Sequence, residues 1–298
     1  MWIYASDRYV LPLPAGHRFP MRKYAALRER VRRLAPERLR EPPGADDGAL
    51  GRVHAPAYID AVTNGRLDAA AQRRIGFPWT PAMVERSRRS AGATMAACRS
   101  ALVHGVGVNL AGGTHHAHRD FGAGFCVFND AAVAARAMQV EAGVDRVLIV
   151  DLDVHQGDGT AALLADDATI FTFSMHGRRN FPFRKCASDL DVELDDGTGD
   201  AAYLETLRAA LSVVLARMTP DLAIYLAGAD PYAGDRLGRL SLSKPGLAAR
   251  DRRVLGSLRE RGVPVAIAMA GGYADDIEDS VDIHEATVAT ALEFAAAA

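Results

Sequence analysis

The sequence predicts a single α/β domain in which a mostly parallel sheet of about eight strands carries helices on both faces. Short apolar runs typical of buried strands alternate with longer segments of helical periodicity, which is the pattern of repeated βαβ units. No Ser/Gly-rich linker, internal repeat or low-complexity tract interrupts this alternation, apart from an Ala-rich C-terminus. We therefore expect residues 1–298 to form one domain.

Four helices are predicted from their caps and their apolar periodicity. Thr80 and Pro81 have the residue types of an N-cap and a first helical position, and apolar residues then recur along one face until Gly105. Asn129 is expected to cap the next helix, and Pro220 to end the third. The four predicted helices cover residues 81–105, 129–143, 200–220 and about 245–261.

Five apolar runs are predicted strands, at residues 106–110, 146–150, 169–173, 221–227 and 263–269. Polar or Gly-rich clusters follow four of them directly, at residues 111–116, 151–155, 228–230 and 270–273. Because parallel strands end at the same edge of a sheet, and ligands of open α/β sheets bind at that edge, these clusters are expected to converge on one site.

Charge patterning argues against nucleic-acid binding as the main role. The formal net charge is -2, from 35 Lys and Arg against 37 Asp and Glu. The arginines of residues 28–40 are interleaved with Leu27, Val31, Leu34 and Leu39, as on the solvated face of an amphipathic helix. They do not form the contiguous basic block that is typical of a nucleic-acid interface.

The cysteines and the hydrophobic pattern favour a cytoplasmic protein. Cys98, Cys126 and Cys186 are odd in number and widely spaced, which suits neither a disulfide framework nor a thiolate zinc site. No uninterrupted apolar stretch reaches about 18 residues, so that no membrane span is expected. The first residues also lack the basic and apolar regions of a signal peptide.

The cluster after residues 146–150 predicts a metal centre. In an extended segment, Asp151, Asp153 and His155 point to one side while Leu152 and Val154 face the other. Together with a third strand-end carboxylate, the chain offers three metal ligands and leaves a position for water and substrate. These ligands are Asp153, His155 and Asp230. The set suits Zn²⁺, and Fe²⁺ is also compatible with it.

The other clusters supply groups for hydrolysis of an amide. His115 and His116 are candidates for proton transfer, and Tyr273 is a candidate hydrogen-bond donor to a developing oxyanion. Asp151 and Asp158 are placed to fix the tautomers of the two histidines. The predicted chemistry is attack on an amide carbonyl by a metal-activated water.

These motifs resemble those of the zinc-dependent histone deacetylase family, which has an arginase-like fold. In chain order the resemblance is carried by residues 112–118, 122–130, 151–160, 174–176, 228–231 and 271–273. Residues 16–20 and 155–157 are most similar to the compact bacterial and class IV members.

The resemblance implies a role for each residue of the site. Asp153, His155 and Asp230 would bind zinc, and His116 would act as general base and then general acid. His115 would act mainly through its charge. The resemblance pairs Asp151 with His115 and Asp158 with His116. It also implies a potassium ion held partly by backbone carbonyls, with the ligands Asp151, Asp153, His155, Ser174 and Met175.

The implied substrate tunnel accepts a chain like that of an acyl-lysine. Its expected lining is Gly124, Phe125, Gly271, Gly272 and either Phe181 or Phe183. Residues 76–80 stand where some family members have an aspartate that grips the substrate backbone, and they contain no carboxylate. Acylated lysine, an acylated polyamine or another small amide therefore all remain candidate substrates, and hydroxamates are expected inhibitors.

Two alternatives to a deacylase follow from the same residues. An arginase-type ureohydrolase would need a second metal ion, for which Asp158 and Asp235 would have to serve. A module that binds acylated amines without turnover would keep the pocket but not need the complete set of catalytic groups. Serine or cysteine hydrolysis is disfavoured, because no G-x-S-x-G motif is present.

Overall fold

The computed structural model of the protein describes residues 1–295, and its centre is an eight-stranded sheet in which every pairing is parallel. The strand order is β2-β1-β3-β8-β7-β4-β5-β6. The strands are β1 (Ile3–Tyr4), β2 (Leu39–Arg40), β3 (Val106–Asn109), β4 (Val147–Asp151), β5 (Ile170–Gly177), β6 (Leu190–Leu194), β7 (Leu222–Leu226) and β8 (Val265–Ala268).

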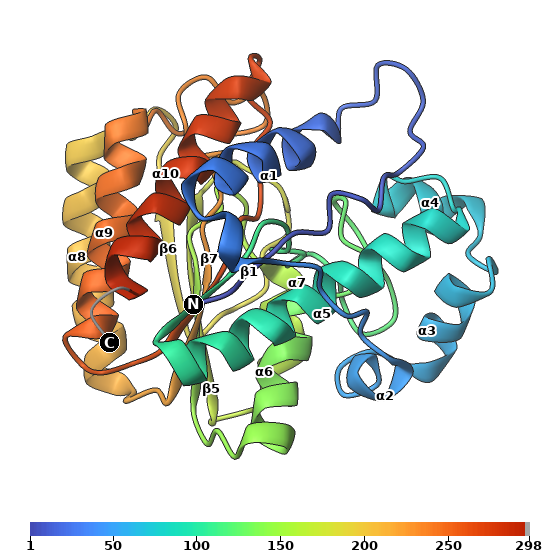
Figure 1. Ribbon diagram of the computed structural model, residues 1–298, viewed down its shortest axis with the longest axis horizontal. Helices are drawn as coiled ribbons and strands as arrows, with labels where there is room; N and C mark the ends of the chain where they lie inside the picture. Colours follow the sequence, from blue (N-terminus) through green and yellow to red (C-terminus); the bar gives the residue numbers. More distant parts are fainter. Residues whose placement is uncertain (296–298) are drawn as a thin grey trace.

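Helices cover both faces of the sheet (Figure 1). They are α1 (Arg22–Leu34), α2 (Asp47–Leu50), α3 (Pro56–Thr63), α4 (Ala69–Ile75), α5 (Pro81–His104), α6 (Asp130–Ala142), α7 (Asp158–Leu164), α8 (Asp200–Arg217), α9 (Lys244–Arg259) and α10 (Ile277–Ala295). One core contains side chains of α1, α8, α9 and α10, and the other contains side chains of α2 to α7. In β4, Leu148 and Val150 face the first core while Val147 and Ile149 face the second.

The predicted capping residues act as expected. The Thr80 side chain accepts a hydrogen bond from the Met83 amide at the start of α5, and the Asn129 side chain accepts one from the Ala132 amide at the start of α6. Gly143 ends α6 in the left-handed conformation, with φ of 66°. None of the described helices is both long and apolar enough to cross a membrane.

The Arg-rich segment departs from the prediction of one amphipathic helix. Helix α1 ends at Leu34, a short 3₁₀ turn follows at Pro36–Arg38, and Leu39–Arg40 form edge strand β2. Pro36 has no amide hydrogen to continue the α-helical pattern. The leucine at position 39 therefore packs against the sheet as part of a strand and not as part of a helix.

The topology places the four sequence clusters side by side. Strands β3, β8, β7 and β4 are consecutive neighbours in the sheet, and each of the four clusters follows one of them. Strand β4 ends at Asp151, so that the extended geometry stops before the residues that follow. Leu152 and Val154 are nevertheless fully buried in the core, which turns the polar residues between and beyond them toward the sheet edge.

Candidate active site

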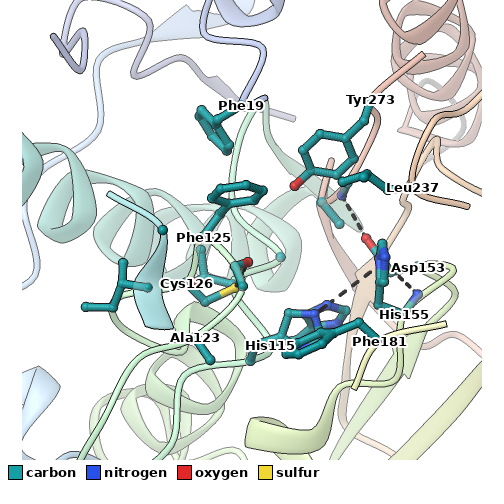
Figure 2. Close-up of a pocket in the computed structure, with 18 of the residues that line it drawn as sticks. Phe19, His115, Ala123, Phe125, Cys126, Asp153, His155, Phe181, Leu237 and Tyr273 are labelled. Carbon is teal, nitrogen blue, oxygen red and sulfur yellow. Dashed lines mark hydrogen bonds and ion pairs between the residues drawn. The ribbon is translucent and has the colours of Figure 1, made fainter. Parts of the chain in front are cut away.

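Asp153, His155 and Asp230 converge to form the one candidate metal centre found within residues 1–295. Each offers a ligand atom within 4.8 Å of the others. His155 Nδ1 lies 3.0 Å from Asp153 Oδ1 (Figure 2) and 3.3 Å from Asp230 Oδ2. The two carboxylates come from the loops after β4 and β7, which are adjacent strands.

The backbone holds both carboxylates in place from behind. The Val154 amide donates to Asp230 Oδ1 at 2.9 Å, and the Gly271 amide donates to Asp153 Oδ2 at 2.8 Å. A Cβ atom on Gly271 would lie 1.9 Å from Asp230 Oδ2, which explains why glycine is required at this close approach. Asp230 Oδ2 is buried and makes no hydrogen bond within the described residues.

The charges of this cluster show that it is built for a cation. Burial and the negative charge of Asp153 raise the pKa of Asp230. Burial alone would lower the pKa of His155, but the hydrogen bond with Asp153 and the negative charges of Asp153 and Asp230 outweigh it and raise that pKa to about 10. A proton on His155 therefore compensates the two buried carboxylates. A divalent ion would neutralise more of the negative charge of these carboxylates, so that the residues present fit a metal.

His115 and His116 face one another beside this cluster, with their Nε2 atoms 3.1 Å apart. His115 Nδ1 donates to Asp151 Oδ2 at 2.7 Å, and His116 Nδ1 donates to Asp158 Oδ1 at 2.6 Å. Asp158 stands at the start of α7, where the helix dipole favours a negative charge. The geometry thus has the two pairings that the sequence predicted.

The two histidines have opposite charge states near neutral pH. Burial lowers the pKa of His115, but the charges of Asp151 and Asp153 outweigh it and raise that pKa to about 9. Burial and the positive charge of His115 lower the pKa of His116 to about 3. His115 is therefore an imidazolium, whereas His116 is neutral and has an Nε2 that can accept a proton.

Asp158 serves a further histidine that the sequence analysis left out. His118 Nε2 donates to Asp158 Oδ2 at 3.2 Å, so that each carboxylate oxygen accepts from a different ring. Burial would raise the pKa of Asp158, but the hydrogen bonds from His116 and His118 outweigh it and hold that pKa well below its usual range. The carboxylate is ionised and fixes the Nδ1–H tautomer of His116.

Tyr273 lies in the segment between β8 and α10 and directs its hydroxyl into the cavity (Figure 2). The Tyr273 amide donates to Asp235 Oδ2 at 2.6 Å, and the other Asp235 oxygen accepts from the amides of Leu237 and Gly238. Burial raises the pKa of Tyr273 well above its ordinary value, so that the phenol keeps its proton and can donate it in a hydrogen bond.

Lys23 is a buried cation that the sequence analysis did not connect with the site. It comes from α1, is 2% exposed, and its Nζ donates to the carbonyls of Ala270 and Gly272, at 3.4 and 3.2 Å. The Nζ atom also lies 5.5 Å from the centre of the Tyr273 ring. Lys23 therefore holds the segment that carries Tyr273. The signal in the sequence that could have drawn attention to Lys23 is the rarity of lysine, which occurs at only three positions of this chain.

A cavity of about 870 Å³ runs past the metal centre into the protein. Phe125, whose backbone has a φ of 68°, and Phe181 both line this cavity (Figure 2). The ring centre of Phe181 lies 4.8 Å from that of His116. Phe183, the other candidate, is 87% exposed at the outer end. Glycine at position 124 lets the cavity wall approach His116 closely, since a Cβ there would lie 2.7 Å from His116 Cδ2.

The residues of the predicted potassium site are adjacent in space. Asp151 at the end of β4 is paired in register with Ser174 of β5, and Met175 follows in the same strand. Both Ser174 and Met175 are buried. Ser174 Oγ is engaged by His176 Nδ1 at 2.9 Å. A potassium ion at this position stays a prediction.

The all-parallel sheet with its polar clusters at one edge has the architecture of the arginase-like α/β class. Two solved structures share this architecture. An HDAC homologue complexed with SAHA has a TM-score of 0.83, and the match covers 99% of this chain and 84% of the homologue. The HDA15 HD domain has a TM-score of 0.82, and the match covers 98% of this chain and 91% of that domain. Each is 22% identical in sequence, so that the likeness establishes the fold.

The histone deacetylase domain profile matches residues 17–288, and the chain therefore belongs to the histone deacetylase family. It is 46% identical over 285 residues to an uncharacterized protein of Picosynechococcus sp., with 95% of each chain covered. It is 30% identical to the histone deacetylase-like amidohydrolase of Pseudomonas aeruginosa, over 80% of this chain and 66% of that protein. Histone deacetylase 2 of Arabidopsis thaliana is 36% identical, and the match spans 65% of this chain and about half of the relative, 52%.

Proposed function

We propose that this protein is a metal-dependent amidohydrolase that removes acetyl or longer acyl groups from N-acylated lysine or a related amine. The observation that carries the proposal is the one candidate metal centre of residues 1–295, which lies beside a histidine pair that carries one positive charge. Relatives named as histone deacetylases and as an amidohydrolase support the same chemistry. A hydroxamate is expected to inhibit, in keeping with the solved homologue that holds SAHA.

Asp153, His155 and Asp230 would hold the ion, with Zn²⁺ as the first candidate and Fe²⁺ compatible. When bound, such an ion polarises the substrate carbonyl and lowers the pKa of water from 15.7 toward about 7. His116 Nε2 then accepts the proton of the attacking water and delivers it to the leaving amine.

The other residues of the site hold charge in place during this transfer. Asp158 keeps His116 in the tautomer that can accept a proton, and the cationic His115 offsets the negative charge that develops nearby. Tyr273 donates a hydrogen bond to the oxyanion. Phe125 and Phe181 would pack against the methylenes of the substrate and keep water from them.

The structure offers no separate ligand set for the binuclear alternative within residues 1–295. Asp158 is engaged by two histidines, and Asp235 by three backbone amides. The complete set of proton-transfer groups likewise argues against a module without turnover. A potassium ion and a cytoplasmic location remain part of the proposal.

The direct test is hydrolysis of acetyl-, octanoyl- and myristoyl-lysine by the metal-loaded protein. We expect turnover that a chelator abolishes and added Zn²⁺ restores, and a loss of at least about a hundredfold in His116→Ala and in Tyr273→Phe. The control His104→Ala should keep full activity, because this half-buried side chain at the end of α5 lies outside the cavity. Turnover by His116→Ala at the parent rate would contradict the assigned base.

A further inference from the structure

Six exposed arginines surround the mouth of the cavity. They come from the segment before α1, from the end of α4, from the segment between β5 and β6, and from the segment between β7 and α9. They are Arg18, Arg73, Arg74, Arg179, Arg236 and Arg239, here called the arginine rim.

Few carboxylates oppose this charge. Asp196 is shared by Arg179 at 3.7 Å and Arg239 at 3.3 Å, and Asp275 lies 3.7 Å from Arg236. Within residues 1–295, Arg18, Arg73 and Arg74 have no ion pair. The acidic residues that line the cavity in this part of the chain are the two at the metal centre. The mouth is therefore cationic on a chain whose net charge is -2.

The arginines stand behind opposite walls of the cavity. Arg73 and Arg74 come three and two residues before Gly76, where a Cβ would lie 2.8 Å from the Phe125 ring. Arg179 precedes Phe181, and Leu237 lies between Arg236 and Arg239 in the sequence. Phe125 and Leu237 face each other across the cavity (Figure 2). A chain that crosses the mouth with one side chain in the tunnel would meet arginines before and after that residue.

We propose that the substrate is an acylated lysine within an acidic segment of polypeptide, with Asp or Glu on both sides of the lysine. The proposal rests on the deacylase function and narrows its substrate class. Acylated polyamines are disfavoured, because their remaining ammonium groups would be repelled by the rim. A single small anion would engage one wall, whereas flanking carboxylates engage both.

The test compares matched acetyl-lysine peptides that differ only in their flanking residues, which are acidic, neutral or basic. We expect kcat/KM to be about fivefold to thirtyfold higher for the acidic peptide than for the neutral one, as two to four exposed ion pairs would give. The difference should lie in KM and shrink between 50 and about 500 mM salt. An acetylated polyamine and an acetylated amine that carries a phosphate complete the panel.

The double variant Arg73→Gln/Arg179→Gln removes one cation from each wall. It should lose most of the preference for the acidic peptide while free acetyl-lysine is hydrolysed at the parent rate. Arg253→Gln is the matched control, because Arg253 is exposed on α9, outside the cavity lining. Equal kcat/KM for the three peptides, or a preference for the polyamine or the phosphate-bearing amine, would overturn the inference. Absence of hydrolysis of every acyl amide would instead overturn the proposed function.

Discussion

Replacement of Asp158 by Asn should separate the orientation of the base from its presence. In the parent protein each oxygen of this buried carboxylate accepts one hydrogen bond, from His116 at 2.6 Å and from His118 at 3.2 Å. Asn has the same shape but only one acceptor oxygen, and its amide group donates. One histidine must therefore face a donor. If that ring is His116, its proton moves to Nε2, the atom that must accept a proton from water.

The expected cost is about a hundredfold to ten-thousandfold in kcat. The upper value is the loss known when the aspartate of a serine protease triad becomes Asn and fixes the wrong tautomer, about 10⁴. The lower value applies if His118 takes the unfavourable partner and His116 loses only the negative charge beside it. At about 1.4 kcal/mol for each factor of ten, the range is about 3 to 5 kcal/mol of transition-state stabilisation.

The assay is steady-state hydrolysis of acetyl-lysine by the metal-loaded variant, with bound metal and the unfolding temperature measured on the same sample. KM should change little, because Asp158 lies behind His116 and not in the cavity lining. Asp120→Asn is the control, since Asp120 is a nearby exposed carboxylate. Parent-level kcat in a folded, metal-loaded Asp158→Asn protein would refute the tautomer argument.

Three further predictions concern stability, positioning and the metal centre. Burial lowers the pKa of His54 to about 4 from 6.5. The stability that neutral His54 contributes is therefore complete above pH 6.5 and declines by about 1.4 kcal/mol per pH unit toward pH 4. Urea unfolding at pH 7.5 and 5.0 should show a fall in the free energy of unfolding, and the fall should be smaller in His54→Gln. Lys23→Met should reduce kcat at least about tenfold without changing the amount of bound metal, and Lys23→Arg should recover part of the lost kcat. Equal kcat in the parent protein and in Lys23→Met would show that the cation does not position Tyr273. Gly271→Ala should lose bound zinc by elemental analysis, because the new Cβ would lie 1.9 Å from Asp230 Oδ2, whereas Gly256→Ala, whose Cβ would be 4.0 Å from its nearest neighbour Phe294, should retain it.

The sequence predicted the central strands and the metal cluster because both follow from local patterns. Apolar runs mark β3, β4, β7 and β8, and the polar residues come directly after each run. Parallel pairing then requires these ends to share an edge. The resulting proximity of Asp153, His155 and Asp230 needed no knowledge of the loops between them.

The parts that escaped prediction depend on contacts between distant segments. Strands β1 and β2 have two residues each, too few for a periodic signal, and Pro36 divides the Arg-rich segment that looked like one helix. Lys23 lies in a helix rich in Arg, and only the tertiary structure brings it to the carbonyls of residues 270 and 272. The choice between Phe181 and Phe183 depended on the path of an irregular loop.

The consecutive placement of β3, β8, β7 and β4 has a consequence for protein engineering. The groups that handle protons and metal follow the middle of the sheet, whereas four members of the arginine rim belong to segments that carry none of these groups, namely Arg18, Arg73, Arg74 and Arg179. Exchange of those outer segments for ones of other charge or length should therefore retarget the enzyme without rebuilding its reactive centre. Variant libraries confined to these outer segments can therefore diversify substrate selectivity while the metal-binding and proton-transfer residues stay unchanged.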